Sequence, residues 1–257
     1  MESTVKIILT FISGGAIWEG FKFIYPDLKR PIVARIEAKK TFYKNLDPIL
    51  KSSSELYGKL LSLAREDFAT LTNPANSISA DPQLNKKYIL YLFAQFWAHI
   101  EYLRIESHYI ALSKIKNGKR LLQYIDTIES RQYRILDRSV QRIIGECIIS
   151  STSQKFIVMP VNEFISQIDD TTSKLAKWIQ LLDNKLSAST DKEVRQEILR
   201  YGIIVAALID DFDPKYKTVR NRPIYTNKLS AKSKTMIKNN LMKYYLPFIK
   251  NQGRYYE

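Results

Sequence analysis

Residues 84–116, LNKKYILYLFAQFWAHIEYLRIESHYIALSKIK, decide the fold class of this chain. Their apolar side chains recur at intervals of three and four residues, which places them along one face of a helix. The positions that carry this pattern are Ile89, Leu92, Phe93, Phe96, Trp97, Ile100, Leu103, Tyr109 and Ile110. Asn117 and Gly118, which tolerate a left-handed backbone, should end the helix. We therefore predict a long, half-apolar helix in an all-α protein.

Helical patterns extend on both sides of this segment. Pro31 suits a first helical turn and opens a helix from about 31 to 69, which Pro48 should kink or break. Further helices are predicted at about 119–129, 131–150, 161–168, 171–187, 191–212 and 230–246. Thr190 and Glu193 form a capping box for the helix that begins near 191. Only eight glycines are present in 257 residues, which is few for the tight turns of an all-β protein.

These patterns together predict a bundle of about five to seven helices, several of them long, preceded by an N-terminal hydrophobic helix. The uncharged core of that first helix, Ile7 to Trp18, has twelve residues. A membrane span needs about 20 apolar residues, so it would have to include Lys6, Glu19 and Lys22. Residues 5–25 therefore either span a membrane marginally, lie on its surface or pack in a core. The anchor positions are Ile7, Ile8, Leu9, Phe11, Ile12, Gly14, Gly15, Ile17 and Trp18.

Basic residues follow the apolar run directly, at Lys29, Arg30, Arg35, Lys39 and Lys40. If the segment spans, the positive-inside rule places them and the rest of the chain in the cytoplasm. We expect the inner or cytoplasmic membrane as the location, with the helical domain in the cytoplasm, and a cytoplasmic protein otherwise. The predicted parts are an anchor helix at 1–27, a helical domain at 28–214 and a basic, Tyr-rich extension at 215–257.

The net charge of +14 comes mostly from the C-terminal end. Residues 214–257 hold eleven Lys and Arg against a single acid, Glu257. Interleaved tyrosines suit both a membrane interface and the stacked bases of single-stranded nucleic acid. We predict that this segment binds an anionic lipid surface, binds nucleic acid, or is a solvated or protein-covering tail. The lysines that cluster most closely are Lys228, Lys232, Lys234 and Lys238.

The apolar segment with its Gly pair is followed by FYKNLDPILKSSSELYGKL at 42–60, YLFAQFWAHIEYLRIE at 91–106, QRIIGE at 141–146 and LIDDFDP at 208–214. In this order the stretches resemble an uncharacterised family of bacterial proteins. The resemblance implies a small helical domain that is anchored at its N-terminus and faces the cytoplasm. It covers residues 5 to about 214 and implies no activity, because its motifs are packing patterns rather than catalytic signatures.

Polar side chains interrupt the apolar faces of two predicted helices and can form a layer inside the bundle. Buried polar groups need partners, which facing helices can supply. Such a layer either forms a polar pocket or fixes the register of the helices. Glu101 and Arg104, three residues apart, can pair on another face. The members of the predicted polar layer are Gln95, His99, Glu106, Gln141 and Glu146.

Asp210, Asp211 and Asp213 form the most concentrated acidic group. Carboxylates in an α bundle can hold Mg²⁺ for diphosphate chemistry. Acids at a helix C-terminus oppose the helix dipole, however, so we expect Arg or Lys side chains to pair with them. The chain has two histidines and one cysteine, Cys147, and it lacks HExxH, GxxxxGK[ST], GxGxxG and GxSxG sequences. We therefore predict no catalytic residues, no metal and no cofactor.

The favoured hypothesis is a membrane-tethered cytoplasmic helical protein that acts through protein or lipid contacts and not through catalysis. The alternatives are a soluble helical nucleic-acid-binding protein, a Mg²⁺-dependent helical enzyme that uses the acidic group, and an oligomerising membrane effector. Membrane lipid is the expected partner. A protein partner or self-association is a further option, and nucleic acid is less favoured.

Overall fold

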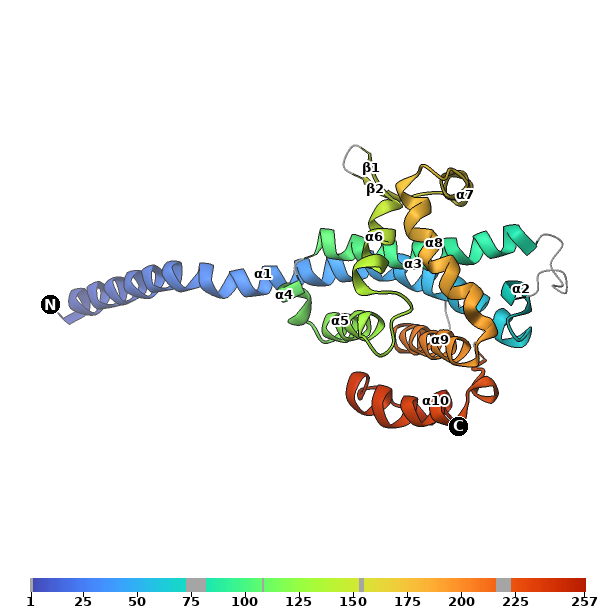
Figure 1. Cartoon of the computed structure of the whole chain (residues 1–257). Helices are drawn as coiled ribbons and strands as arrows, with labels where there is room; N and C mark the ends of the chain where they lie inside the picture. Colours follow the sequence, from blue (N-terminus) through green and yellow to red (C-terminus); the bar gives the residue numbers. More distant parts are fainter. Residues whose placement is uncertain (1, 73–81, 108, 153–154, 216–222) are drawn as a thin grey trace.

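The computed structural model describes the backbone of residues 2–72, 82–107, 109–152, 155–215 and 223–257, and the side chains within 33–72, 83–107, 109–150, 157–215 and 223–257. These residues form ten α-helices and one two-stranded sheet, arranged as a helical bundle (Figure 1). Seven of the ten helices have nine residues or more. The all-α class is confirmed. Of the three shorter helices, the one at Ala231–Met236 falls in the helix predicted at 230–246, and those at Ala69–Thr72 and Tyr109–Ser113 were not predicted as separate elements.

The helices are α1 (Glu2–Arg65), α2 (Ala69–Thr72), α3 (Pro82–Glu106), α4 (Tyr109–Ser113), α5 (Lys116–Glu129), α6 (Arg138–Cys147), α7 (Val161–Asp169), α8 (Lys174–Ser187), α9 (Lys192–Phe212) and α10 (Ala231–Met236). A π-helical segment, η4 (Ile237–Tyr245), continues α10. Strands β1 (Ile149–Thr152) and β2 (Lys155–Val158) pair antiparallel, with Ile149 opposite Val158.

The core is one apolar cluster in which α3 packs against both α1 and α6, while α1 also packs against α9. The apolar positions of α3 from Ile89 to Leu103 that the spacing predicted are at most 3% exposed. Trp97 Nε1 donates a hydrogen bond to the Tyr201 hydroxyl at 2.9 Å and so joins α3 to α9. The core face predicted for the first part of 84–116 is confirmed.

The second part of 84–116 differs from the prediction. The helix ends at Glu106, and α4 and α5 follow as separate elements. Gly118 lies in the first turn of α5 and does not end a helix. A glycine is needed there because a Cβ atom on Gly118 would lie 2.3 Å from the Leu112 carbonyl oxygen. Ile110, predicted to be in the core, is 76% exposed. The helical spacing of apolar residues thus continues in the sequence beyond the part of the chain that packs in the core.

Helix α1 runs from Glu2 to Arg65 without interruption, so the predictions of a start at Pro31 and a break at Pro48 were wrong. Proline removes one backbone hydrogen bond from a helix interior and favours a kink. Next to Pro48, however, Leu46, Ile49 and Leu50 are all buried in the bundle. Their packing on both sides of Pro48 holds the helix together despite the missing bond.

Only half of the helix predicted at 131–150 is α-helical. Helix α6 begins only at Arg138, where the Asp137 carboxylate caps it by accepting the Ser139 backbone N–H at 3.0 Å. From Ile149 the chain enters the β1–β2 hairpin, because its β-branched residues can pair with β2. The start of α9 is likewise capped by Asp191, which accepts the Glu193 N–H at 2.7 Å, and not by Thr190. The other helices agree with the sequence to within a few residues.

The described part of the C-terminal segment, 223–257, packs into the same core as the rest of the chain. The side chain of Gln196 on α9 makes two hydrogen bonds to the backbone of this segment. Nε2 donates to the Lys228 carbonyl at 3.0 Å, and Oε1 accepts the Ser230 N–H at 2.8 Å. This segment, expected as an extension, therefore completes the bundle. Its buried side chains include Tyr225, Leu229, Ile237, Leu241, Met242 and Leu246.

The N-terminal half of α1 runs out of the bundle as a single ribbon (Figure 1). The predicted anchor positions belong to this half, and their side chains lie outside the described residues. Among the described residues, we find no helix with the length and apolar character needed to cross a membrane.

Candidate functional site

A cavity of about 350 Å³, here called the α9 cleft, opens between the end of α9, the start of α5 and the C-terminal segment. Its lining combines three cations with two carboxylates and a tyrosine. The residues that line it are Arg120, Ala207, Asp210, Asp211, Pro214, Ile249, Lys250, Asn251, Arg254 and Tyr255. The acidic group singled out from the sequence therefore lies in this cleft.

The carboxylates of the α9 cleft are held by neighbouring side chains. Asp211 forms an ion pair with Arg120, whose guanidinium lies 4.6 Å from the centre of the Phe248 ring. Asp210 accepts a hydrogen bond from the Tyr255 hydroxyl at 2.8 Å and lies 3.5 Å from Arg254 Nη1. The predicted pairing of Asp210 and Asp211 with cations is confirmed. Among the described residues, no group of three or more metal-ligating side chains comes together. Asp210 and Asp211 each face an arginine.

Burial raises the pKa of Asp211 to about 6, although Arg120 acts in the opposite direction. An unfolded Asp has a pKa of about 3.9, so the folded state binds the proton more tightly. The stability gained from protonated Asp211 is fully present below about pH 4 and is lost as the pH rises through about 6. Relative to Asp211→Asn, the wild type should lose stability over this range in urea unfolding. Parallel pH profiles for the two proteins would contradict the raised pKa.

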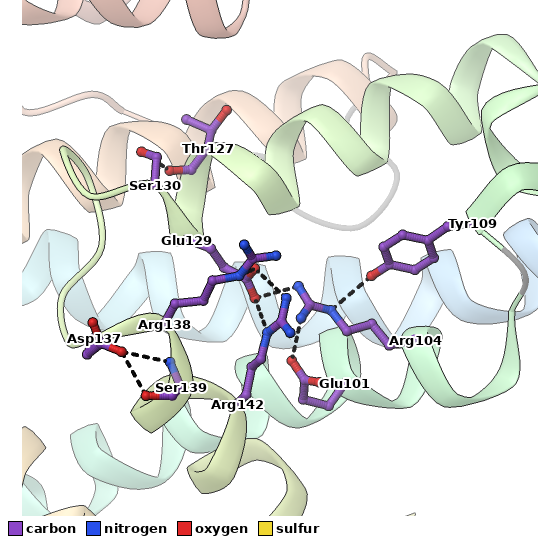
Figure 2. A network of polar contacts seen from close by, with 10 residues as sticks. All are labelled: Glu101, Arg104, Tyr109, Thr127, Glu129, Ser130, Asp137, Arg138, Ser139 and Arg142. Carbon is purple, nitrogen blue, oxygen red and sulfur yellow. Dashed lines mark hydrogen bonds and ion pairs between the residues drawn. The ribbon is translucent and has the colours of Figure 1, made fainter.

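A second polar group, here called the Glu129 cluster, is buried between α3, α5 and α6 (Figure 2). Glu129 is 7% exposed and accepts from Arg104, from Arg138 Nε at 2.8 Å and from Arg142 Nη2 at 3.1 Å. Arg104 also lies 3.3 Å from Glu101, as the spacing predicted, and donates to the Tyr109 hydroxyl at 2.9 Å. Both oxygens of Glu129 are occupied by arginines, so the cluster acts as a clamp on three helices.

Burial changes the pKa values of two carboxyl groups near the Glu129 cluster. It raises the pKa of Glu101, against the effect of Arg104, and it raises the pKa of Asp126, to which the charge of Glu129 adds. Gln141, one of the predicted polar layer, lines a small cavity of about 10 Å³ beside Trp97 and Glu129. Gln141 is 2% exposed, and neither polar atom of its amide has a hydrogen-bond partner within the described residues.

The five residues of the predicted polar layer do not form one site. Burial and the charge of Lys51 lower the pKa of His99 to about 4, so this imidazole is neutral at pH 7. Glu106 pairs with Lys44 and accepts a hydrogen bond from Asn45 of α1 at 2.8 Å. Glu146 is exposed on α6, whereas Gln95 is partly buried on α3 with its carbonyl oxygen unpartnered among the described residues. The layer is thus divided among separate helix contacts.

The four clustered lysines of the C-terminal segment each have an intramolecular contact. Lys228 pairs with Asp67 at 2.7 Å and Lys232 with Glu193 at 3.4 Å. Lys234 donates to the Glu257 backbone oxygen at 3.2 Å, and Lys238 lies 5.8 Å from the centre of the Tyr256 ring. Acids far away in the sequence therefore offset part of the basic charge. Binding of lipid or nucleic acid by these lysines stays a prediction.

Exposed apolar side chains gather where α1 leaves the bundle, on a surface here called the α1 exit face. Ile36 and Tyr43 on α1 are 61% and 58% exposed, and Ile105 on α3 and Ile110 on α4 are 55% and 76% exposed. Sequence reasoning missed this surface because Ile110 continues the helical spacing of the core.

Comparison of the chain with known protein families, with curated proteins and with solved structures finds no match. The resemblance to an uncharacterised bacterial family stays a prediction. The function has to be inferred from the geometry of these surfaces.

Proposed function

We propose that the protein is a non-catalytic helical protein that is tethered to a membrane by the N-terminal part of α1 and acts through lipid or protein contacts. The observation that carries the proposal is that α1 continues out of the bundle as a single ribbon (Figure 1). The sequence places its apolar run, Ile7 to Trp18, on this projecting part. An apolar helix face in water is unfavourable by about 25 cal/mol per Å². A lipid phase or another chain is therefore needed to cover it.

The location that fits this arrangement is the inner or cytoplasmic membrane, with the bundle in the cytoplasm, because Lys and Arg follow the apolar run. Neither described polar site favours an enzyme. Arginines pair with Glu129, Arg120 pairs with Asp211, and the Tyr255 hydroxyl donates to Asp210. Self-association of the projecting helices would cover the same apolar run, and we keep the oligomerising membrane effector as the second candidate.

Deletion of residues 1–26 should release the protein from membranes without unfolding the bundle. The first buried side chain among the described residues is Ala38, so this deletion removes none of the described core. The full chain should float with lipid vesicles in a density gradient, and the deletion variant should stay at the bottom. Circular dichroism should show the same cooperative unfolding for both apart from the lost helix.

A full chain that stays at the bottom as a monomer would contradict the proposal. A full chain that stays at the bottom as a defined oligomer, which the deletion converts to a monomer, would favour self-association through α1. As a matched control, Ile8→Asp with Ile12→Asp keeps the length of the segment and removes its apolar character. This variant should behave as the deletion does.

A further inference from the structure

We infer that the α1 exit face docks on the headgroups of an anionic lipid surface, so that this end of the bundle lies against the membrane. The inference rests on the proposed tether and adds what the bundle itself recognises. Ten large apolar side chains are conspicuously exposed among the described residues, and five of them lie on α1 before Lys44 or on the α3–α4 corner. These five are Val33, Ile36, Tyr43, Ile105 and Ile110.

Specific contacts bring the two stretches of the face together. Glu106, at the end of α3, pairs with Lys44 and accepts from Asn45 at 2.8 Å. The Lys44 ammonium also lies 6.0 Å from the centre of the Tyr102 ring. Helix α4 also packs against α1, which places Ile110 on an element next to α1. Figure 1 shows α4 beside α1 at the point where α1 leaves the other helices.

The surroundings of these apolar side chains are strongly basic. Residues 33–44 and 105–119 hold seven Lys and Arg against two Glu, a net charge of +5. One of the two acids, Glu106, is already paired with Lys44. Five further lysines of these stretches are exposed, namely Lys39, Lys40, Lys114, Lys116 and Lys119. A partner that covers this face must therefore be negatively charged and must accept isoleucine side chains.

An anionic membrane surface has both properties. Its potential attracts basic residues, and its interface accepts apolar side chains to a depth of about 5–10 Å. A single weak membrane signal gives only marginal binding, and a second signal beside it makes attachment stable. The apolar run of α1 is short for a span, so a basic and apolar surface farther along the same helix is the second signal that such a tether needs. The positive charge of this face, together with the proposed tether on the same helix, is why we choose lipid over a protein partner.

The test uses the full chain with Cys147→Ser, because Cys147 is the one cysteine of the sequence. An environment-sensitive fluorophore is attached at Ile110→Cys or, as a control, at Leu84→Cys. Leu84 is 49% exposed and lies near the start of α3. It is 22 residues before Glu106, which is about 33 Å along the helix. The probes are vesicles of phosphatidylcholine alone and vesicles in which part of it is replaced by phosphatidylglycerol.

We expect a blue-shifted emission at position 110 on the anionic vesicles, no shift there on the neutral vesicles, and no shift at position 84 on either. Replacing Lys114, Lys116 and Lys119 by Gln should abolish the shift. Each basic residue near an anionic surface strengthens binding roughly fivefold, so the three changes should weaken partitioning onto anionic vesicles by up to roughly a hundredfold. Replacing Lys174, Lys177 and Lys192 by Gln removes the same charge from α8 and α9 and should leave the shift in place.

Two failures can be told apart. If the full chain binds neither kind of vesicle, the proposed tether fails and the docking face fails with it. If the chain binds both kinds equally and the label at 110 stays in water, the tether stands and the docking face is wrong. A shift at 110 that grows with protein concentration in the absence of vesicles would show that a second copy covers the face. Equal shifts at 110 and 84 would also overturn the inference.

Discussion

Glu129→Gln is expected to lower the free energy of unfolding by about 3 kcal/mol, because removing one partner of a buried ion pair leaves the other partner's charge uncompensated. The side chain of Glu129 is 6% exposed and is the shared acceptor of three arginines. Arg138 and Arg142 can turn toward water, since their side chains are 52% and 34% exposed. Arg104, at 13%, cannot do so as easily and keeps Glu101 and the Tyr109 hydroxyl as partners, of which only Glu101 is charged.

Urea unfolding measures this effect as a lower midpoint at an unchanged slope. Glu146→Gln is the matched control, because it makes the same chemical change at an exposed position of α6, and it should shift stability by no more than about 0.5 kcal/mol. If both variants unfold at the same midpoint, the Glu129 cluster contributes no more than surface ion pairs do, and the clamp on three helices is disproved.

Gly145→Ala should destabilise the protein by about 2 kcal/mol, since overpacking a close helix contact costs more than the helix propensity of Ala returns. A Cβ atom at Gly145 would lie 2.9 Å from the carbonyl carbon and oxygen of Trp97 and 3.1 Å from Ala98 N. All three are backbone atoms of α3 and cannot rotate away. Helices α3 and α6 would have to separate, which would loosen the contact that also carries the Glu129 cluster.

Gly58→Ala, which is also a change inside a helix, should alter the stability in the opposite direction. Gly58 lies inside α1, and a Cβ atom there would meet nothing within 4 Å. Ala is favoured over Gly in a helix interior by about 0.8–1.0 kcal/mol, so this variant should gain stability. Thermal unfolding of the two variants side by side decides the matter. Stabilisation by Gly145→Ala would show that α3 and α6 lie farther apart than described.

Part of the candidate sites could be predicted from the sequences of single helices. The carboxylates Asp210 and Asp211 sit at a helix C-terminus, where the dipole makes cationic partners favourable, and Arg120 and Arg254 supply them. The Glu101–Arg104 pair follows from its spacing on α3. The identity of Arg120 as a partner did not follow, because it lies 91 positions away from Asp211.

The Glu129 cluster and the α1 exit face were not readable in this way. Glu129 meets its arginines only because α3, α5 and α6 converge, and their angles depend on packing. Likewise, Ile100 and Ile110 both fit the helical spacing, but the first is 2% exposed and the second 76%. Spacing shows which side of a helix is apolar, and it does not show where along the helix the neighbouring elements stop.

The sequence by itself determined the all-α class and the position of most helices, because a period of three to four apolar residues depends only on near neighbours in the chain. The tertiary structure alone decided that α1 passes Pro48 unbroken, that residues 149–152 form a strand, and that Lys228 and Lys232 meet acids of the turn after α1 and of α9. The acids that meet these lysines are distant in sequence, whereas β1 pairs with the neighbouring β2. Packing and charge across the bundle outweigh local propensities of about 1 kcal/mol or less per residue.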